Sequence, residues 1–297
     1  MKKADIKVGF SCNNRCLFCV QGDKRFQVVD KTDEEVKGNI RKARSSCDIV
    51  TFTGGEPTLR KGLVDFIRLA AELRFKTIQI QTNGRMFAYL DYCKSLIAAG
   101  ANEFSPALHG HVPELHDYLT NAPGSFRQVV AGIKNLKSLG QRVITNTVIT
   151  KPNYRHLPEI ARLLSGLKVD QFQFAFVHAT GSARKNFDSI VPRKTLVEPY
   201  LKEALAVGIK NGISVMAEAM PFCFMAGFED QVSERIMPEM AIFDEHGHLP
   251  DFKKSRLAEG KAKGSACRKC KYDAVCEGPW KEYPERYGWS EFEPITV

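Results

Sequence analysis

Short β-rich runs alternate with amphipathic helical stretches up to about residue 217, and this alternation constrains the fold most strongly. A strand followed by a helix, repeated along a chain, predicts a parallel sheet with right-handed crossovers. Six such units are fewer than the roughly eight that close a barrel, so we expect an α/β fold with a partial (β/α)6 TIM-like barrel. The expected strands are residues 6–10, 49–53, 77–82, 103–108, 143–150 and 172–177, with a short seventh at 213–217; the expected helices are 32–45, 59–74, 86–99, 126–139, 155–164 and 196–210.

The pattern changes beyond residue 217, where the alternation of strands and helices fades. The last 31 residues hold three cysteines, two tryptophans and three tyrosines. A short aromatic segment rich in cysteine, without strand or helix runs, is typical of a module that folds around a metal. We therefore expect a barrel domain over residues 1–217 and a small cysteine-rich iron–sulfur module over residues 218–297.

Composition limits the classes of protein to which the chain can belong. With 297 residues, 43% hydrophobic and 26% charged, it resembles a globular enzyme with a substantial core. No apolar run approaches the roughly 18–20 residues of a membrane span, and the basic start lacks the apolar segment of a secretion signal. We therefore expect a cytoplasmic protein without a membrane partner, whose nine cysteines ligate metal rather than form disulfides. The formal charge of +9 is compatible with an acidic peptide, a phosphorylated small molecule or RNA as a partner, so nucleic acid is not excluded.

Three of these cysteines lie close together on the loop expected after the first strand. They stand in the run Cys12-Asn13-Asn14-Arg15-Cys16-Leu17-Phe18-Cys19, a C-x3-C-x2-C spacing. Iron–sulfur clusters are normally held by four cysteine thiolates, so three predict a cluster with one iron open to other ligands. A zinc knuckle or three unrelated core cysteines are the alternatives. The isolated Cys47 and Cys93 are expected to be packing residues, because free cysteine usually behaves as a small buried hydrophobic residue.

Polar motifs also follow the next two expected strands, as is typical of an active site at the carboxyl ends of barrel strands. Gly54-Gly55-Glu56-Pro57 closes the strand at 49–53, and Asn83-Gly84 follows the strand at 77–82. Two glycines allow the backbone to approach a ligand closely, although a simple tight turn is the alternative.

The two motifs together resemble the signature of the radical S-adenosylmethionine (radical SAM) family. The resemblance implies that Cys12, Cys16 and Cys19 hold a catalytic 4Fe-4S cluster and that its open iron binds SAM. In that family an electron from the cluster breaks a C–S bond of SAM, and the 5'-deoxyadenosyl radical takes a hydrogen atom from the substrate. The residues that the resemblance assigns to cofactor binding are Phe18, Gly54, Gly55, Glu56, Pro57, Asn83, Ser105 and Asn146. Turn-forming or capping roles are the alternatives for Asn83 and Ser105.

Three histidines follow the fourth and sixth strands and are candidates for substrate contact. His109 stands where many family members carry an aspartate, and His111 lies two residues on. His178 follows the strand at 172–177 and faces the same end of the expected barrel. An imidazole there can act as an acid, a base or a hydrogen-bond donor, while packing within the loop is the alternative.

The second group of cysteines lies in the C-terminal region. Cys267-x2-Cys270-x5-Cys276, with Cys223 upstream, supplies four thiols, and a Cys-x2-Cys pair serves zinc as well as iron. The group resembles the C-terminal modules called twitch and SPASM, which implies one auxiliary 4Fe-4S cluster. Whether Cys223 ligates that cluster or leaves an open iron for substrate stays open.

The resemblance implies the reaction type better than the substrate. We expect hydrogen abstraction from a peptide or protein side chain, giving oxidation or a crosslink, with a flavodoxin- or ferredoxin-type reductant as partner. A small molecule, nucleotide or RNA in cofactor or natural-product biosynthesis is the alternative substrate. A non-catalytic iron–sulfur electron carrier or a zinc-binding protein is the remote alternative, and it leaves Gly54-Gly55-Glu56-Pro57 unexplained.

Overall fold

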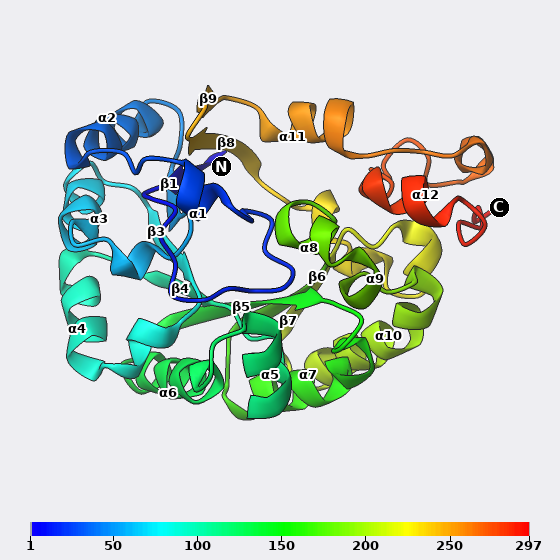
Figure 1. Ribbon diagram of the computed structural model, residues 1–297, viewed down its shortest axis with the longest axis horizontal. Helices are drawn as coiled ribbons and strands as arrows, with labels where there is room; N and C mark the ends of the chain where they lie inside the picture. The colour runs from blue at the N-terminus through cyan, green and yellow to red at the C-terminus, as the bar shows by residue number, and fades with distance from the viewer. Residues whose placement is uncertain (1, 297) are drawn as a thin grey trace.

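The structure is a computed structural model that describes residues 2–296. Nine strands form one curved sheet in the centre of the molecule, and most helices lie along its outer side (Figure 1). The strand order is β7-β6-β5-β4-β3-β2-β1-β8-β9. The strands are β1 (Lys2–Lys7), β2 (Ile49–Thr53), β3 (Thr77–Thr82), β4 (Glu103–Pro106), β5 (Arg142–Ile149), β6 (Gln171–Phe176), β7 (Ser214–Glu218), β8 (Glu239–Asp244) and β9 (Gly247–Leu249).

Neighbouring strands from β7 to β8 are parallel, and β9 pairs antiparallel with β8. β7 and β9 are the two edges of the sheet, which is therefore not closed within the described residues. The predicted α/β fold with an open, TIM-like barrel is confirmed. Among residues 2–296, no helix is both long enough and apolar enough to cross a membrane.

The six long helices expected from the sequence all form, within a few residues of the predicted ends. Helix α2 begins at a capping box, in which Thr32 Oγ1 accepts from the Glu35 amide and Glu35 accepts from the Thr32 amide. The helices are α1 (Lys24–Gln27), α2 (Asp33–Arg44), α3 (Leu63–Glu72), α4 (Leu90–Ala99), α5 (Pro113–Thr120), α6 (Ser125–Ser138), α7 (Leu157–Gly166), α8 (Gly181–Lys185), α9 (Phe187–Ile190), α10 (Lys194–Lys210), α11 (Phe252–Ser255) and α12 (Glu282–Tyr287).

The main core lies between the sheet and these outer helices. On β6, Phe172, Phe174 and Phe176 are buried, whereas the residues between them are partly exposed. This period of two places the aromatic rings on the helix side of the sheet, where Phe172 lies against Gly208 of α10. Burying one such ring contributes about 2–3 kcal/mol, so the three rings stabilise the core on this side of the sheet.

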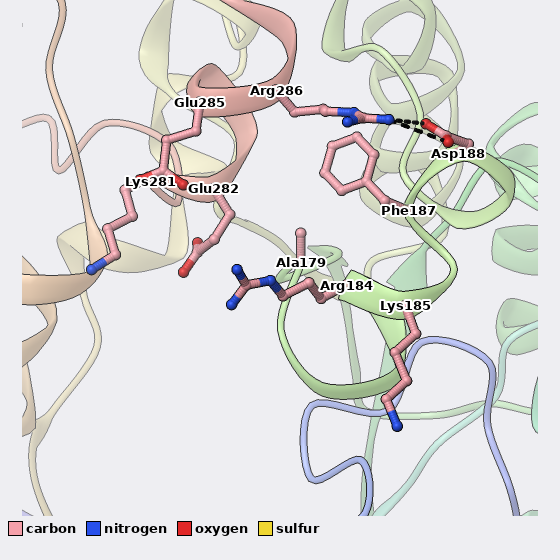
Figure 2. Close-up of a pocket in the computed structure, with 9 residues that line it drawn as sticks. All are labelled: Ala179, Arg184, Lys185, Phe187, Asp188, Lys281, Glu282, Glu285 and Arg286. Atoms are coloured by element: carbon pink, nitrogen blue, oxygen red, sulfur yellow. Dashed lines mark hydrogen bonds and ion pairs between the residues drawn. The ribbon is translucent and has the colours of Figure 1, made fainter.

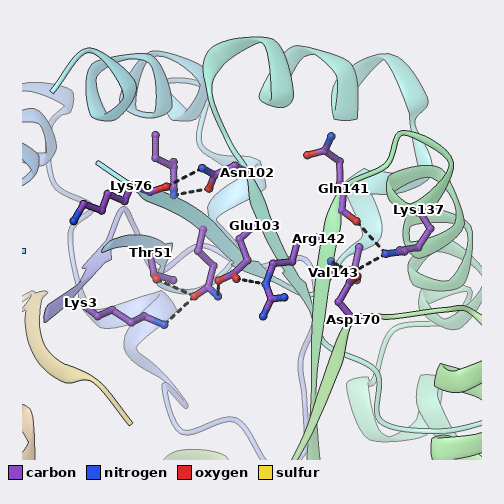
Figure 3. Close-up of polar contacts among 12 residues, drawn as sticks. Lys3, Thr51, Lys76, Asn102, Glu103, Lys137, Gln141, Arg142, Val143 and Asp170 are labelled. Carbon is purple, nitrogen blue, oxygen red and sulfur yellow. Dashed lines mark hydrogen bonds and ion pairs between the residues drawn. The ribbon is translucent and has the colours of Figure 1, made fainter. Parts of the chain in front are cut away.

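Polar side chains link the strands near their amino ends (Figure 3). Lys3 Nζ and Thr51 Oγ1 both donate to Gln79 Oε1, each at 2.8 Å. Gln79 Nε2 donates to Glu103 Oε1 at 2.7 Å, and Arg142 Nε donates to Glu103 Oε2 at 2.8 Å. This row crosses β1 to β5 and gives each side chain a partner, which offsets the cost of burying polar groups.

The structure differs from the sequence-based expectation at both ends of the sheet. β1 begins at Lys2 rather than residue 6, because Lys2 and Lys3 pair with β8 and β2. The two lysines obscured the apolar pattern, so the sequence did not reveal this start. β8 and β9 were not predicted, and β8 extends the sheet next to β1. Val232 also forms a single parallel bridge to Ala217 at the β7 edge. Residues beyond 217 thus contact both sides of the barrel, and the domain division there stays a prediction.

Candidate functional site

The loop after β1 brings Cys12, Cys16 and Cys19 together. The three thiols are partly exposed and free. Burial raises the pKa of the Cys16 thiol, and the neighbouring Cys19 and Cys12 raise it further. Burial likewise raises the pKa of Cys12, partly opposed by the Asn14 amide, which donates to its Sγ at 3.4 Å. Three thiolates in this position repel one another, so the set favours a cationic metal centre that relieves the repulsion.

Side chains from the turn after β3 hold this cysteine loop in place. Arg85 Nη1 donates to Asn13 O at 2.7 Å and to Asn14 Oδ1 at 3.1 Å. Asn83 Nδ2 donates to Asn13 Oδ1 at 2.6 Å. Asn83, a predicted cofactor residue, therefore lies beside the cysteine loop, whereas Arg85 was missed by the sequence reasoning. Its only sequence signal was its place directly after Asn83-Gly84.

Gly54 and Gly55 let the end of β2 approach the start of the cysteine loop. The Gly55 amide donates to Gly9 O and the Glu56 amide to Ser11 O, both at 2.8 Å. A Cβ on Gly54 would lie 2.1 Å from Gly9 O, and one on Gly55 would lie 2.2 Å from the Phe10 carbonyl oxygen. Gly54 also has a φ of +133°, which favours glycine. The two glycines are therefore required by this close packing of two backbones.

Glu56 joins the ends of β2 and β3 through its buried carboxylate. Oε1 accepts from the hydroxyls of Thr58 and Thr82, each at 2.5 Å, and Oε2 accepts from the Asn83 amide at 2.7 Å. Burial raises the pKa of Glu56, while these hydrogen bonds oppose the rise. Pro57 then begins a 3-10 turn over Pro57–Leu59 that Glu56 caps. The Glu56 carboxylate thus supports the cysteine loop through Asn83, while the Glu56 amide bonds to Ser11 O directly.

Ser105 and Asn146 lie on neighbouring strands of the same barrel. Ser105 is buried on β4, opposite Gln81 of β3. Asn146 lies on β5, and its Oδ1 is buried without a hydrogen-bond partner among residues 2–296. An unpaired buried acceptor costs about 1–3 kcal/mol. Asn146 therefore suits a polar ligand inside the barrel, and its contact with SAM stays a prediction.

Phe18 and His109 pack against each other between the cysteine loop and the loop after β4. Their rings meet edge to face at 4.6 Å. His109 Nδ1 accepts from the Val148 amide at 3.2 Å, and the His109 amide donates to His116 Nδ1 at 3.1 Å. Burial lowers the pKa of His109, and His116 lowers it further, so the ring is neutral with its proton on Nε2. These contacts agree with the packing alternative for His109.

The other two candidate histidines lie in different places. His111 lies at 5.0 Å from the His156 ring, and burial lowers its pKa. The His178 ring stacks on Trp280 at 3.9 Å, and its Nε2 lies 3.3 Å from Glu282 Oε2. His178 therefore joins the barrel to the C-terminal region, while His111 lies near the start of α7.

The second set of thiols lines one cavity in the C-terminal region. Cys223, Cys267, Cys270 and Cys276 all contribute to its wall, together with prolines and Phe222. Burial, together with the neighbouring Cys276 and Cys267, raises the pKa of Cys223 to about 12. Within residues 2–296, no three His, Cys, Asp or Glu side chains are gathered tightly enough to hold a single metal ion. Lys263, Asp273 and Glu293 also line the cavity. Four thiols around one cavity form a donor set that fits an iron–sulfur group.

Cys47 and Cys93 lie apart from both sets. Both are buried in the main hydrophobic core, with 1% and 0% of their surfaces exposed. Cys93 Sγ donates to Phe87 O at 3.2 Å. The prediction that these two cysteines are packing residues is confirmed.

Comparison with known proteins places the chain in a family. The model of the radical SAM superfamily matches residues 6–164, more than half of the chain. The AdoMet-dependent heme synthase of Oleidesulfovibrio alaskensis is 30% identical over 175 residues, 58% of this chain and 45% of that protein. The GTP 3',8-cyclase of Aquifex aeolicus is 30% identical over 176 residues, 57% of this chain and 54% of that protein. The chain thus spans about half the length of the curated relatives it matches.

A solved structure resembles the chain over nearly its whole length. SuiB from Streptococcus suis, solved bound to S-adenosylmethionine, has a TM-score of 0.69 at 15% identity, over 99% of this chain and 76% of that chain. The same protein bound to its precursor peptide SuiA has a TM-score of 0.67 at 16% identity, over 99% and 74%. At these identities the likeness shows a shared fold. The family works with a 4Fe-4S cluster and SAM. The family match covers both N-terminal motifs, and the chain belongs to the radical SAM superfamily of enzymes.

Proposed function

We propose that this radical SAM enzyme oxidises or crosslinks a peptide or protein side chain with the help of one auxiliary 4Fe-4S cluster. The observation that carries this proposal is the C-terminal cavity lined by four cysteines. Four thiolates can ligate a cluster fully, and such a cluster exchanges electrons without binding substrate. It is suited to take the electron that remains on a substrate after hydrogen abstraction.

At the N-terminal site, each residue group has a distinct task. Cys12, Cys16 and Cys19 would ligate the first cluster, and reduced cluster and SAM together supply homolytic C–S cleavage and hydrogen abstraction. The backbone at Gly54 and Gly55 would hold SAM on one side. On the other side, the unpaired Oδ1 of Asn146 would accept a hydrogen bond from it; these sites are supported by the geometry described above.

The remaining proposed contacts position the cofactor. Glu56, Pro57 and Asn83 form the hydrogen-bonded corner that fixes the cysteine loop. Ser105 is placed on the adjoining strand, and Phe18 covers the loop from the side of His109. We propose that an external flavodoxin- or ferredoxin-type protein supplies the electron.

A peptide substrate is supported by how much of this chain each similar protein covers. SuiB, which was solved with a precursor peptide, resembles 99% of the chain, including the cysteine-rich tail. The matches to the heme synthase and the cyclase cover only 58% and 57% of the chain. These two relatives favour a small molecule or nucleotide as the second candidate substrate.

The auxiliary cluster is tested by deleting single thiols from anaerobically reconstituted protein. Cys276→Ala should lose up to about four irons per chain while the N-terminal cluster remains. The matched control is Cys93→Ala, which removes a buried thiol outside both sets and should keep the full iron content. Zinc in place of iron in the wild-type protein, or unchanged iron in Cys276→Ala, would contradict the proposal. The substrate class is tested by whether peptides or GTP accelerate 5'-deoxyadenosine formation.

A further inference from the structure

Glu218, at the carboxyl end of β7, directs its side chain into the interior of the barrel. Val215 of the same strand and Phe172 of β6 both lie against Gly208 of α10, which places them on the helix side of the sheet. Successive side chains of a strand point to opposite faces, so Glu218 and Gln173 point away from that helix. Gln173 Nε2 donates to Glu218 Oε2 at 2.6 Å. The two side chains therefore line the interior together.

Glu218 shares this interior with Asn146, the proposed contact of SAM. Asn146 of β5 lies opposite Gln173 of β6, and Gln173 lies opposite Met216, two residues before Glu218. Neighbouring strands are about 4.8 Å apart and two residues span about 6.6 Å, so the backbones at Glu218 and Asn146 are about 12 Å apart. Asn146, Gln173 and Glu218 are partly exposed, although the residues on both sides of each are buried. Solvent therefore reaches the interior at these three side chains.

A cavity lies just beyond the carboxyl end of β6, the strand next to β7, between the α8–α9 segment and α12 (Figure 2). Its volume is about 530 Å³, within the range of about 300–1,000 Å³ that is common for ligand pockets. Ala179, shortly after β6, forms part of its wall, and the Ser182 amide of α8 donates to Cys19 O at 2.8 Å. A substrate segment in this cavity would therefore lie beside the cysteine loop and the strand next to Glu218.

Glu218 forms no ion pair among residues 2–296, because the charged side chains that act on it are paired with one another. Lys261 Nζ lies 3.3 Å from Glu234 Oε1, and Arg256 Nη2 lies 2.6 Å from Glu277 Oε1. Both pairs belong to the C-terminal region, and neither carries a net charge. The hydrogen bond to Glu218 described above comes from a neutral amide. No cation therefore fixes Glu218 in its charged form.

Two buried lysines near Glu218 also have other partners. Lys194 Nζ donates to Ala219 O and Lys3 Nζ donates to Gln79 Oε1, each at 2.8 Å. Burial lowers the pKa of Lys194 well below its usual range. Burial also lowers the pKa of Lys3, and Glu218 is one of the carboxylates that oppose this fall. Both lysines thus leave the Glu218 carboxyl group without a cationic hydrogen-bond donor.

The surroundings of Glu218 suit the exchange of a proton. Burial, together with the Glu234 carboxylate, raises the pKa of Glu218 to about 7, against the opposing effect of Lys261 and Arg256. A carboxyl group with such a pKa can take up or release a proton near neutral pH, as general bases do. Oε2 accepts from Gln173, so Oε1 is the oxygen available to a proton from a substrate. Glu218 thus combines the position, the access and the proton affinity of an acid–base group.

The proposed oxidation needs a group of this kind. When the 5'-deoxyadenosyl radical takes a hydrogen atom from a substrate carbon, a carbon radical remains. This radical has to lose one electron and one proton to become a closed-shell product. An oxidised 4Fe-4S cluster is suited to accept the electron. The proton requires a separate acceptor.

We propose that Glu218 is the catalytic base that takes this proton. The O–H or N–H bond next to the radical carbon breaks, and its proton binds to Glu218 Oε1. Two of the three electrons from that bond and the radical form the C=O or C=N double bond, and the third leaves to the oxidised 4Fe-4S cluster. The inference rests on the proposed function and adds the residue that completes its oxidation chemistry.

The test uses the full-length, reconstituted protein with SAM, a chemical reductant and a library of random nine-residue peptides. Two products are measured, 5'-deoxyadenosine and peptides that are lighter by two hydrogen atoms. Glu218→Gln should still form 5'-deoxyadenosine but should yield about a hundredfold less oxidised peptide per 5'-deoxyadenosine, which is the usual contribution of a general base. Glu203→Gln is the matched control, because it makes the same change at an exposed ion pair with Arg162 on α10. It should keep the wild-type ratio of the two products.

A second readout follows the proton itself. In the wild type, oxidised peptide per 5'-deoxyadenosine should fall as the pH drops below about 7, because protonated Glu218 cannot accept another proton. Infrared difference spectra of the peptide-free protein should show a carboxylic acid band that disappears as the pH rises through about 7. This band should be present in Glu203→Gln and absent in Glu218→Gln.

Iron content confirms that each variant has folded. A wild-type ratio of the two products in Glu218→Gln overturns the proposal, and so does an infrared band that this variant retains. If Glu218→Gln keeps the ratio but needs more peptide to accelerate 5'-deoxyadenosine formation, the proposal is also overturned, in favour of a substrate-binding role. Failure of the proposed function is read separately in the wild type, as absence of 5'-deoxyadenosine or of oxidised peptides.

Discussion

Gly55 is where the cofactor motif and the cysteine loop press most closely together, so Gly55→Ala should displace the loop. The added methyl carbon would lie 2.2 Å from Phe10 O and 2.5 Å from Ser11 O. Normal contacts require the two backbones to separate by about 1 Å, and overpacking of this kind costs about 1–3 kcal/mol. Separation also weakens the bonds from Gly55 N to Gly9 O and from Glu56 N to Ser11 O, each about 1 kcal/mol. Together these terms lower the free energy of unfolding by about 2–5 kcal/mol.

The effect is measured by urea unfolding of the anaerobic, metal-free protein and by the iron content after reconstitution. Gly38→Ala provides the matched control, because it makes the same chemical change within α2, where no atom beyond the adjoining helix backbone lies within 4 Å of the added carbon. That change should stabilise the protein by about 0.5–1 kcal/mol, since alanine is the better helix former. The two variants should therefore shift stability in opposite directions. A Gly55→Ala protein with wild-type stability and full iron content would refute the reasoning.

Three further predictions follow from other parts of the structure. Cys16→Ala should abolish SAM cleavage while Cys270→Ala spares much of the uncoupled cleavage but blocks product; retained turnover in both would contradict the scheme of two clusters. Lys194 is fully buried and its Nζ donates to Ala219 O at 2.8 Å, holding Ala219 at a φ of +58°. Without that hydrogen bond Ala219 would leave this φ, so Lys194→Met should lower the iron bound by the C-terminal cysteines. Adding Ala219→Gly should restore the iron, because glycine adopts this φ without strain. Unchanged iron in the single variant would contradict this role. Burial raises the pKa of Glu218 from 4.5 to about 7, so stability should fall as pH rises through that window. Glu218→Gln should match wild type in urea unfolding at pH 4.5 and exceed it by about 3 kcal/mol at pH 8; equal stabilities at pH 8 would contradict the assignment.

The sequence predicted the parts of the fold that depend on local pattern. β2 and β3 form at the residues expected, because IVTFT and TIQIQT are short runs rich in Ile, Val and Thr that end at the Gly-Gly and Asn-Gly turns. β8 was missed because only Ala241 and Phe243 are buried, which leaves a weak pattern. Its place beside β1 depends on pairing between opposite ends of the chain, which no local pattern reveals.

In the candidate site, too, local features were predicted and contacts between distant parts of the chain were missed. The C-x3-C-x2-C and Cys-x2-Cys spacings were found because they are local in the sequence, whereas Cys223 lies far upstream of Cys267. The roles of Arg85 and Thr82 were missed because they depend on contact between loops that follow different strands. The glycines at 54 and 55 were expected to approach a ligand, and the structure shows that they also approach the backbone of the cysteine loop.

The most direct test of the account is to reconstitute the protein anaerobically with iron and sulfide, reduce it, add SAM and assay 5'-deoxyadenosine alongside an iron count. We expect 5'-deoxyadenosine together with about eight irons per chain, four for each thiol set. About four irons with activity would contradict the auxiliary cluster and make the C-terminal cysteines a zinc or structural site. No 5'-deoxyadenosine under competent reduction would contradict the account at its centre.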